Sequence, residues 1–401
     1  MQRRRFIQLA AAAGAAALPL PGFIRSGFAA DRIDIGAVYS STGPFASAAV
    51  LANRGSKLAV DTYGKAGGAA LNYVLLDDQG DPGKAVRKVQ EAIEQMKIRH
   101  FIGATISSMA LAISKEVHKA GGIYTNQGGA DEITGPDCNR STFRWPVATY
   151  GAIEQTVRPM IELNPGAKRW YTITGQYVFG EALLRNTKAV LAEKGLEHAG
   201  NSYHSLAEKE FSGYITAAIA QKPDVLCILN FGNQTADVLR QAVSFGAKRN
   251  MKIVVPWSTG LDQFQALGSN VIEGVYFGLQ YWHEVDAPGN RRLRQLVKEK
   301  LNETPTYLVA VGYAIVQMLL EGMNKANDIE PAKIIAAMEG MTYEGITGDE
   351  TIRAGDHQVI KDYYLAIGKA RSAMKDGENF ADIISSGKSF LPLEKTGCKM
   401  A

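Results

Sequence analysis

The sequence predicts an α/β protein built from two doubly wound, Rossmann-like lobes. Short apolar runs alternate along the chain with longer stretches in which apolar residues recur at helical spacing. This alternation occurs as two successive series, and the roughly 370 residues that carry them exceed what one hydrophobic core usually serves. Alternating strands and helices are typical of parallel sheets with helices on both faces, so we expect one such sheet in each series.

The first series runs from residue 33 to residue 129. Its predicted strands lie at 33–40, 72–82, 100–105 and 121–129, and its predicted helices at 45–66, 82–96 and 108–120. The second strand ends in an acidic turn, "DDQGDP", whose proline is typical of the first turn of a helix. Each strand is therefore expected to lead into a helix that returns to the next strand.

The second series begins at residue 169. Strands are predicted at 169–174, 195–204, 224–231, 252–258 and 274–283, and helices at 180–194, 212–221, 234–245, 288–301 and 306–326. The segment "GDETIRAGDHQVIKDYYLAIGKA" alternates polar and apolar residues around Gly-Asp turns, so we expect a hairpin over 345–368.

The first 30 residues have the composition of an export signal. Their "RRRFI" segment is similar to the twin-arginine motif, and small residues favour cleavage after Ala29 or Ala30. The alternative is an uncleaved membrane anchor, although the apolar run is short and broken by glycine and proline. No later segment is expected to span a bilayer, so we expect a soluble protein outside the cytoplasm.

The formal charge of +4 does not describe the mature chain. Four arginines and no acidic residue or lysine lie in the leader, so its removal leaves no net charge. Binding to nucleic-acid backbones depends on an excess of basic charge, and no nucleic-acid partner is expected.

The three cysteines have different surroundings in the sequence. Cys138 lies in a polar loop and Cys398 near the C-terminus, so these two could pair in an oxidising compartment, whereas Cys227 lies in an apolar run and is expected to be buried. Metal-ligand spacings such as C-x-x-C are lacking, and we expect neither a metal nor a cofactor.

Five segments resemble those of one known family in their order and spacing. They are "IDIGAVYSSTGPFA", "LLDDQGDPGKAV", "FIGATISS", "TGQYVFGE" and "VLRQAVSFG". The chain resembles the periplasmic solute-binding proteins of the leucine/isoleucine/valine-binding type, the receptor subunits of ABC importers with the type I periplasmic binding fold. The resemblance covers nearly all of the mature chain.

This resemblance implies two lobes joined by three hinge crossings near 145–151, 279–285 and 360–364. The first lobe would comprise 31–149 and 283–361, and the second 150–282 and 362–401. The lobes would close on a branched-chain amino acid or a related small organic solute and deliver it to membrane permease subunits. The family also implies a monomer in the periplasm that is not an enzyme.

The family resemblance and the strand ends together indicate binding residues in the first lobe. Ser107 and Ser108 stand where a strand passes into a helix, and the family uses a hydroxyl at the position of Ser107 to hold a ligand carboxylate; alternatively, the serines only cap the helix. Further candidates in this lobe are Phe45, Gly128, Gly129 and Ala130. Amino-acid-binding members carry threonine where Ala130 stands, so one carboxylate donor is missing.

The second lobe is expected to supply mainly aromatic contacts. Its candidates are Tyr177, Phe179, Asn230, Phe231, Trp257 and Ser258. Family members that bind α-amino acids place a glutamate near Ser258 to pair with the ammonium, and here the nearest acid is Asp262. An enclosed ammonium without an anion is costly. The ligand could therefore lack an ammonium, as an aromatic or aliphatic carboxylate, an amide or urea would.

Three other functions agree less well with the sequence. A hydrolase using Ser107 or Ser108 would need a nucleophile elbow such as G-x-S-x-G, and "GATISSM" departs from that spacing. A sensory ligand-binding module would share the fold, but no transmembrane or signalling segment follows the second series, which favours a free transport receptor. A metal site at Asp77, Asp78 and Asp81 lacks the spacing of a calcium loop.

Overall fold

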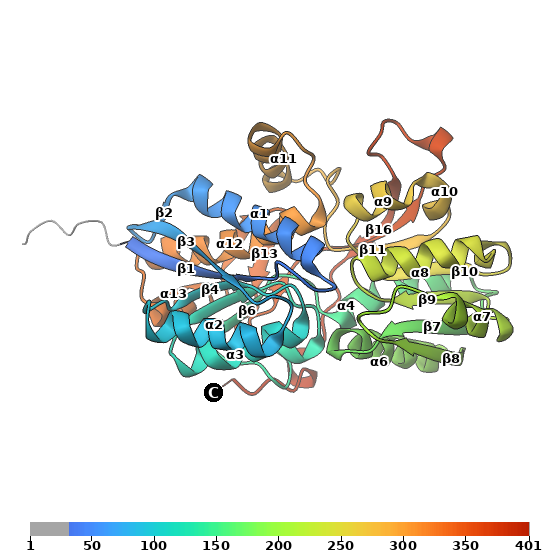
Figure 1. Ribbon diagram of the computed structural model, residues 1–401, viewed down its shortest axis with the longest axis horizontal. Helices are drawn as coiled ribbons and strands as arrows, with labels where there is room; N and C mark the ends of the chain where they lie inside the picture. Colours follow the sequence, from blue (N-terminus) through green and yellow to red (C-terminus); the bar gives the residue numbers. More distant parts are fainter. Residues whose placement is uncertain (1–31, 401) are drawn as a thin grey trace, which may run out of the picture.

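The computed structural model describes residues 32–400, which form two lobes side by side, each with a central sheet between helices (Figure 1). The predicted twin-arginine leader and its cleavage site lie outside the described residues. The α/β class with parallel sheets and the doubly wound arrangement are confirmed.

The first lobe contains a six-stranded sheet. In spatial order its strands are β2 (Lys65–Ala66), β3 (Ala69–Asp77), β1 (Arg32–Tyr39), β4 (His100–Gly103), β5 (Ile123–Asn126) and β6 (Thr142–Arg144). All neighbours pair in parallel except β2, which runs antiparallel to β3. The strand order reverses between β1 and β4, and such a switch point is where α/β sheets bind ligands.

Helices cover both faces of this sheet (Figure 1). One face carries α1 (Ala46–Tyr63), α12 (Tyr307–Ala326) and α13 (Pro331–Met338), and the other carries α2 (Pro82–Glu94) and α3 (Ser107–Lys119). Helix α2 shows why these segments become helices. Pro82 occupies its first turn, the Asp81 carboxylate accepts from the Lys84 amide at 2.6 Å, and its buried residues, Ala85, Val89 and Ala92, recur at helical spacing.

The second lobe contains a seven-stranded sheet. In spatial order its strands are β16 (Ala381–Gly387), β15 (Tyr363–Gly368), β11 (Tyr276–Leu279), β10 (Lys252–Ser258), β9 (Val225–Leu229), β7 (Arg169–Gly175) and β8 (Glu197–His204). Its helices are α4 (Thr149–Glu154), α5 (Val157–Leu163), α6 (Val178–Glu193), α7 (Ser212–Ala220), α8 (Asn233–Ser244), α9 (Leu261–Leu267) and α10 (Ser269–Ile272). Its order reverses between β7 and β9, which places a second switch point opposite the first.

The hairpin predicted over 345–368 is confirmed in part, because β13 (Gly348–Ile352) and β14 (Val359–Ile360) pair antiparallel within it. Strand β13 also pairs with β12 (Thr342–Gly345), and the three strands form a small sheet near α11 (Pro288–Leu301). Strand β15 instead joins the second main sheet, antiparallel to β11. Alternating polarity identifies strands, but it does not say which strand is the partner.

Within residues 32–400, the chain passes between the two main bodies at 145–148, 280–287 and 361–362. The C-terminal tail differs from the expected assignment of 362–401 to the second lobe. After β16 the chain returns to the first lobe, where a disulfide joins Cys398 to Cys138. Cys227 is free and buried in β9.

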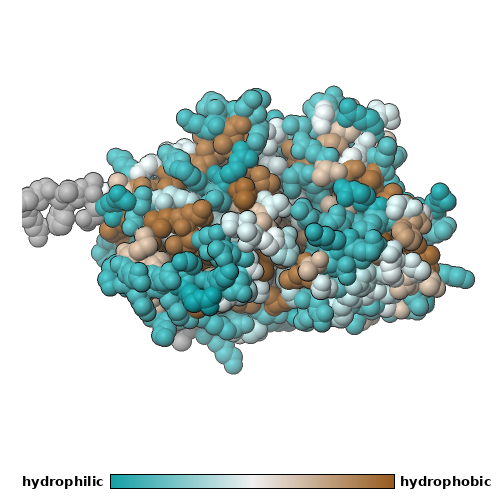
Figure 2. Space-filling model, in the orientation of Figure 1, coloured by the Kyte–Doolittle hydropathy of each residue, from teal (hydrophilic) through white to brown (hydrophobic). Residues whose placement is uncertain are grey.

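Helix α12 corrects another expectation. By length and composition, its 20 residues could cross a membrane. We expected no segment after the leader to be able to do so. However, 83% of the relevant window is buried inside the protein, where α12 packs along α1 and against β4 and β5. Figure 2 shows a mixed surface on the face in view, with brown patches divided by polar residues.

Candidate functional site

A small cavity lies between the lobes, at the carboxyl ends of their strands, with about 250 Å³ of empty space that is partly open to solvent. The lining residues are Thr105, Ile106, Ser107, Gln127, Gly129, Tyr177, Phe179, Phe231, Trp257 and Tyr307. Six of the predicted binding residues are among them.

Ser107 is the first residue of α3, and its side chain does not cap the helix. The N-cap is Ile106, whose side chain has no hydrogen-bonding group, so the first amides of α3 are left without a side-chain partner. The Ser107 hydroxyl instead accepts from the amides of Gly129 and Ala130, at 3.1 and 3.0 Å. Its own proton remains available to donate into the cavity.

The turn before α3 is strained. Ala104 has φ of 64° in a buried position, a left-handed conformation that is uncommon for a residue with a Cβ. Its amide donates to the Val38 carbonyl at 2.9 Å, which ties the turn to the end of β1. Strain of this kind is often found where a fold positions a ligand.

Three polar residues that the sequence reasoning missed complete the wall from the first lobe. Thr105 follows β4 and Gln127 follows β5, and neither Thr105 Oγ1 nor Gln127 Oε1 has a hydrogen-bond partner among residues 32–400. Both stand at strand ends, so the rule that identified Ser107 could have found them. Tyr307, at the start of α12, is far away in sequence and carries no local signal.

The second lobe contributes four aromatic side chains to the cavity. Tyr177 is the N-cap of α6 and Phe179 lies in its first turn, Phe231 follows β9, and Trp257 is the next-to-last residue of β10. Phe179 lies at the centre of the group: its ring stands edge-on to Trp257 at a centroid distance of 5.0 Å, and 6.2 Å from Phe231. The polar wall and the aromatic wall thus come from different lobes.

The other predicted residues lie near the cavity without lining it. Ser108 is half-buried, and Gly128 packs beside Ile133. Asn230 Oδ1 is 2.9 Å from His204 Nε2, and the Ser258 hydroxyl donates to Gln263 and accepts from the Gly260 amide. Ala130 is buried and contributes its amide to Ser107, and Phe45 covers the aromatic wall, with its ring 6.0 Å from those of Tyr177 and Phe231.

Of the aromatic residues near the second crossing, only Trp257 reaches the cavity. Phe277 packs on Phe264 in the core, the Tyr281 hydroxyl donates to Asn290, and the Trp282 indole donates to Glu284.

Among the described residues that line the cavity, none carries a carboxylate, ammonium, guanidinium or imidazole group. Asp262, the acid nearest in sequence to the position of the missing glutamate, accepts from Thr259 at 3.0 Å and is not in the lining. Burial raises the pKa of Asp262 to about 6. Burial also raises the pKa of Tyr177 and Tyr307, so both present neutral hydroxyls.

Direct contacts hold the lobes together around the cavity. Asp131, beside the first-lobe loop, binds Arg185 at 3.1 Å and the Asn186 amide at 2.6 Å, both from α6. On another edge, Asn233 donates to the Ser47 hydroxyl at 3.1 Å. The structure therefore represents the closed arrangement.

The amino-acid sequence of this two-lobed chain also resembles that of known binding proteins. Residues 32–373 match the family described as periplasmic binding protein. The chain belongs to this family. The predicted family is thus confirmed, and it is a family of periplasmic solute-binding proteins rather than of enzymes.

The names of similar proteins mention different ligands. The amino acid ABC transporter substrate-binding protein from Pseudomonas fluorescens Pf-5 has 55% sequence identity and a TM-score of 0.89, covering 93% of this chain and 100% of that chain. The leucine-, isoleucine-, valine-, threonine- and alanine-binding protein of Pseudomonas aeruginosa is 24% identical over 344 residues, 83% of this chain and 89% of the relative. A Rhodopseudomonas palustris BisB5 solute-binding protein in complex with 3,4-dihydroxybenzoic acid shares the fold, with a TM-score of 0.80 at 20% identity over 89% of this chain and 98% of that chain.

Proposed function

We propose that this protein is the exported substrate-binding receptor of an ABC importer and that its lobes close on a small organic carboxylate with an apolar or aromatic body and no α-ammonium group. Family membership and the 55% identical substrate-binding protein support the receptor role. One observation carries the ligand class: uncharged donors from the first lobe face a wall of aromatic rings from the second.

A carboxylate suits the polar wall. The hydroxyls of Ser107 and Thr105 and the open amides at the start of α3 can donate to an anion, and the helix dipole adds a favourable field there. An apolar or ring-shaped body would pack among Tyr177, Phe179 and Trp257.

An ammonium would fit less well. Without a carboxylate in the lining, it would face aromatic rings, and a cation–π contact contributes about 0.5–2 kcal/mol. An enclosed cation without an anionic partner costs several kcal/mol. Branched-chain amino acids, which the family resemblance implied first, are the other candidate ligands, because relatives of this chain are named for binding them.

Catalysis is not part of the proposal. A nucleophilic serine needs a base within hydrogen-bond reach, and within residues 32–400 the hydrogen-bond partners of the Ser107 hydroxyl are two backbone amides.

The proposal also includes removal of the twin-arginine leader, a soluble monomer in the periplasm, permease subunits as partners and no nucleic-acid partner. The Cys138–Cys398 disulfide supports an oxidising compartment.

The test uses ligand pairs that differ only in the ammonium. Leucine is compared with 4-methylpentanoate, and phenylalanine with 3-phenylpropanoate, together with benzoate, by calorimetry and thermal shift on the mature protein. Ligand at 100 times its dissociation constant should add about 2.7 kcal/mol of stability. We expect the acids without an ammonium to bind at least about tenfold more tightly than their amino-acid partners.

The opposite preference, with leucine binding more tightly than 4-methylpentanoate, would establish a hidden ammonium site and favour the second candidate. Hydrolysis of an ester by a chain that binds none of these solutes would contradict the receptor role itself.

A further inference from the structure

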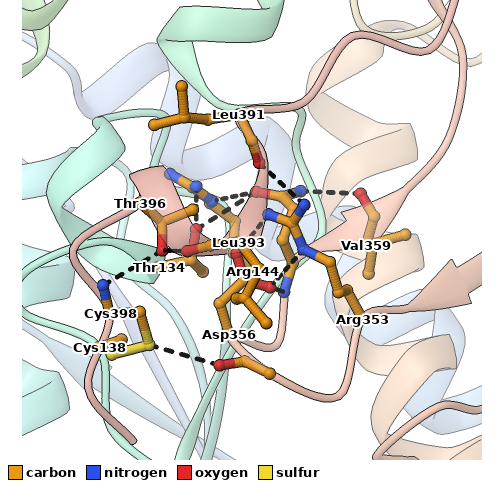
Figure 3. Close-up of polar contacts among 12 residues, drawn as sticks. Thr134, Cys138, Arg144, Arg353, Asp356, Val359, Leu391, Leu393, Thr396 and Cys398 are labelled. Carbon is orange, nitrogen blue, oxygen red and sulfur yellow. Dashed lines mark hydrogen bonds and ion pairs between the residues drawn. A yellow bond between two sulfur atoms is a disulfide. The ribbon is translucent and has the colours of Figure 1, made fainter.

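Arg144, at the end of β6, lies directly behind the loop that lines the cavity. Its side chain is buried, with 1% of the residue exposed. Its Nη1 donates to the carbonyls of Gly129, at 3.4 Å, and Ala130, and its Nη2 donates to Thr134. Its Nε donates to Gln358 at 2.8 Å (Figure 3). Four hydrogen bonds thus fix the guanidinium, and two of them hold it against the 129–130 segment.

The peptide group between Gly129 and Ala130 links Arg144 to Ser107. Its carbonyl oxygen accepts from Arg144, and its amide nitrogen donates to the Ser107 hydroxyl at 3.0 Å. A charged donor on the carbonyl strengthens the amide as a donor, because hydrogen bonds in series polarise one another. The Ser107 hydroxyl, accepting from two amides, becomes in turn a stronger donor toward the cavity.

The charge on Arg144 is not neutralised by a direct ion pair within residues 32–400. Its hydrogen-bond partners there are carbonyl, hydroxyl and amide oxygens. The nearby acids are engaged elsewhere: Asp131 binds Arg185 and Asn186, and Asp356 pairs with Arg353 (Figure 3). Burial lowers the pKa of Arg144 to about 10, so the group keeps its charge at neutral pH.

We propose that Arg144 is a positioning residue that sets the preference of the cavity for an anionic ligand end, acting through the 129–130 peptide and the Ser107 hydroxyl. This inference rests on the carboxylate proposed above. The carboxylate end of a ligand would then experience a cationic field without contacting a cation, which explains how a cavity lined only by uncharged side chains can select an anion.

The experiment compares each acid with its primary amide. The pairs are benzoate with benzamide, 4-methylpentanoate with 4-methylpentanamide, and leucine with leucinamide, titrated into wild type and Arg144→Met. The variant should bind the acid about tenfold or more weakly, whereas the amide should lose less than about threefold. Arg144→Lys should recover part of the preference for the acid, because it restores the charge without the planar fork.

Arg353→Met is the matched control. It removes a guanidinium from the same cluster, one that contacts Asp356 and the Leu391 carbonyl rather than the 129–130 segment. Its acid-to-amide ratio should match that of the wild type. Equal losses for acid and amide in Arg144→Met would assign the residue a purely structural role and overturn the inference alone. A wild type that binds none of the acids would overturn the ligand class as well.

Discussion

At the scale of single residues, the hydroxyl of Ser107 shows how position decides chemistry. The residue is 2% exposed and follows a strained turn at the end of β4, where open helix amides and two loop amides meet. In that setting the hydroxyl can donate to an anion, and no base is hydrogen-bonded to it among the described residues. Ser108 is adjacent in sequence but does not line the cavity.

Ser107→Ala should weaken the binding of the cognate carboxylate by about 10- to 100-fold, since a hydrogen bond to a charged group contributes about 1.5–3 kcal/mol. Calorimetry on the mature protein measures this change, and Ser108→Ala serves as the matched control with affinity close to that of the wild type. Equal losses in both variants would contradict the assigned role of Ser107.

At the scale of elements, the three crossings are bound to one another through side chains. Gln280, on the second crossing, exchanges two hydrogen bonds with the backbone of Val147 on the first, at 3.0 and 2.8 Å. Lys361, on the third, donates to the Gln280 carbonyl at 2.9 Å and lies 4.2 Å from the centre of the Trp145 ring. The hinge therefore contains a fully buried amine.

Lys361 should make stability depend on pH. Burial lowers its pKa to about 7 from the usual 10.5, against the opposing influence of Glu350 and Asp362. Between these two values the unfolded chain binds more protons than the native chain, so the free energy of unfolding should rise with pH across this interval. Denaturant titrations at pH 7, 8 and 9 should show this rise in the wild type and a smaller one in Lys361→Met. Parallel pH profiles would mean that the amine titrates normally.

The C-terminal tail is a further element that spans the lobes. It leaves β16 in the second lobe, its Leu391 carbonyl accepts from Arg353 at 2.9 Å, and it ends at the disulfide with Cys138 (Figure 3). The two cysteines are 260 residues apart in sequence, so the bond closes a long loop in the unfolded chain.

Cys398→Ser should lower the free energy of unfolding by roughly 2–5 kcal/mol and the melting temperature by several degrees. A reductant should lower the melting temperature of the wild type to that of the variant and leave the variant unchanged, as scanning calorimetry can show. If the reductant lowers the melting temperatures of the wild type and the variant equally, its effect does not come from the Cys138–Cys398 disulfide.

At the scale of the whole molecule, function depends on how closely the lobes approach each other. Gly129 lies where the two lobes come close together. A Cβ placed on it would lie 2.6 Å from both the Phe179 and the Trp257 rings, which belong to the opposite lobe. Its φ is not in the left-handed region, so alanine is compatible with its backbone, and only lobe closure prevents a larger residue.

Gly129→Ala should therefore oppose closure while leaving each lobe folded. The steric clash in the closed state would cost about 1–3 kcal/mol and would therefore weaken ligand binding about 5- to 100-fold. Small-angle scattering with saturating ligand should give a larger radius of gyration than for the wild type. Gly166→Ala is the control, because a Cβ there meets no atom within 4 Å. If the Gly129→Ala variant is as compact as the wild type and binds ligand as tightly, Gly129 does not approach the Phe179 and Trp257 rings this closely.

The sequence by itself determined the α/β class, the order of most strands and helices, the family and the placement of Ser107 and Gly129 at strand ends. These follow from local periodicity and from the rule that α/β sheets bind ligands at the carboxyl ends of their strands. The tertiary structure alone decided which residues reach the cavity. Tyr307 arrives from a helix 200 residues after Ser107, Asn230 and Ser258 turn toward neighbours in their own lobe, and β15 leaves its expected hairpin for another sheet. Side-chain direction and strand pairing depend on contacts between distant segments, and no local pattern encodes them.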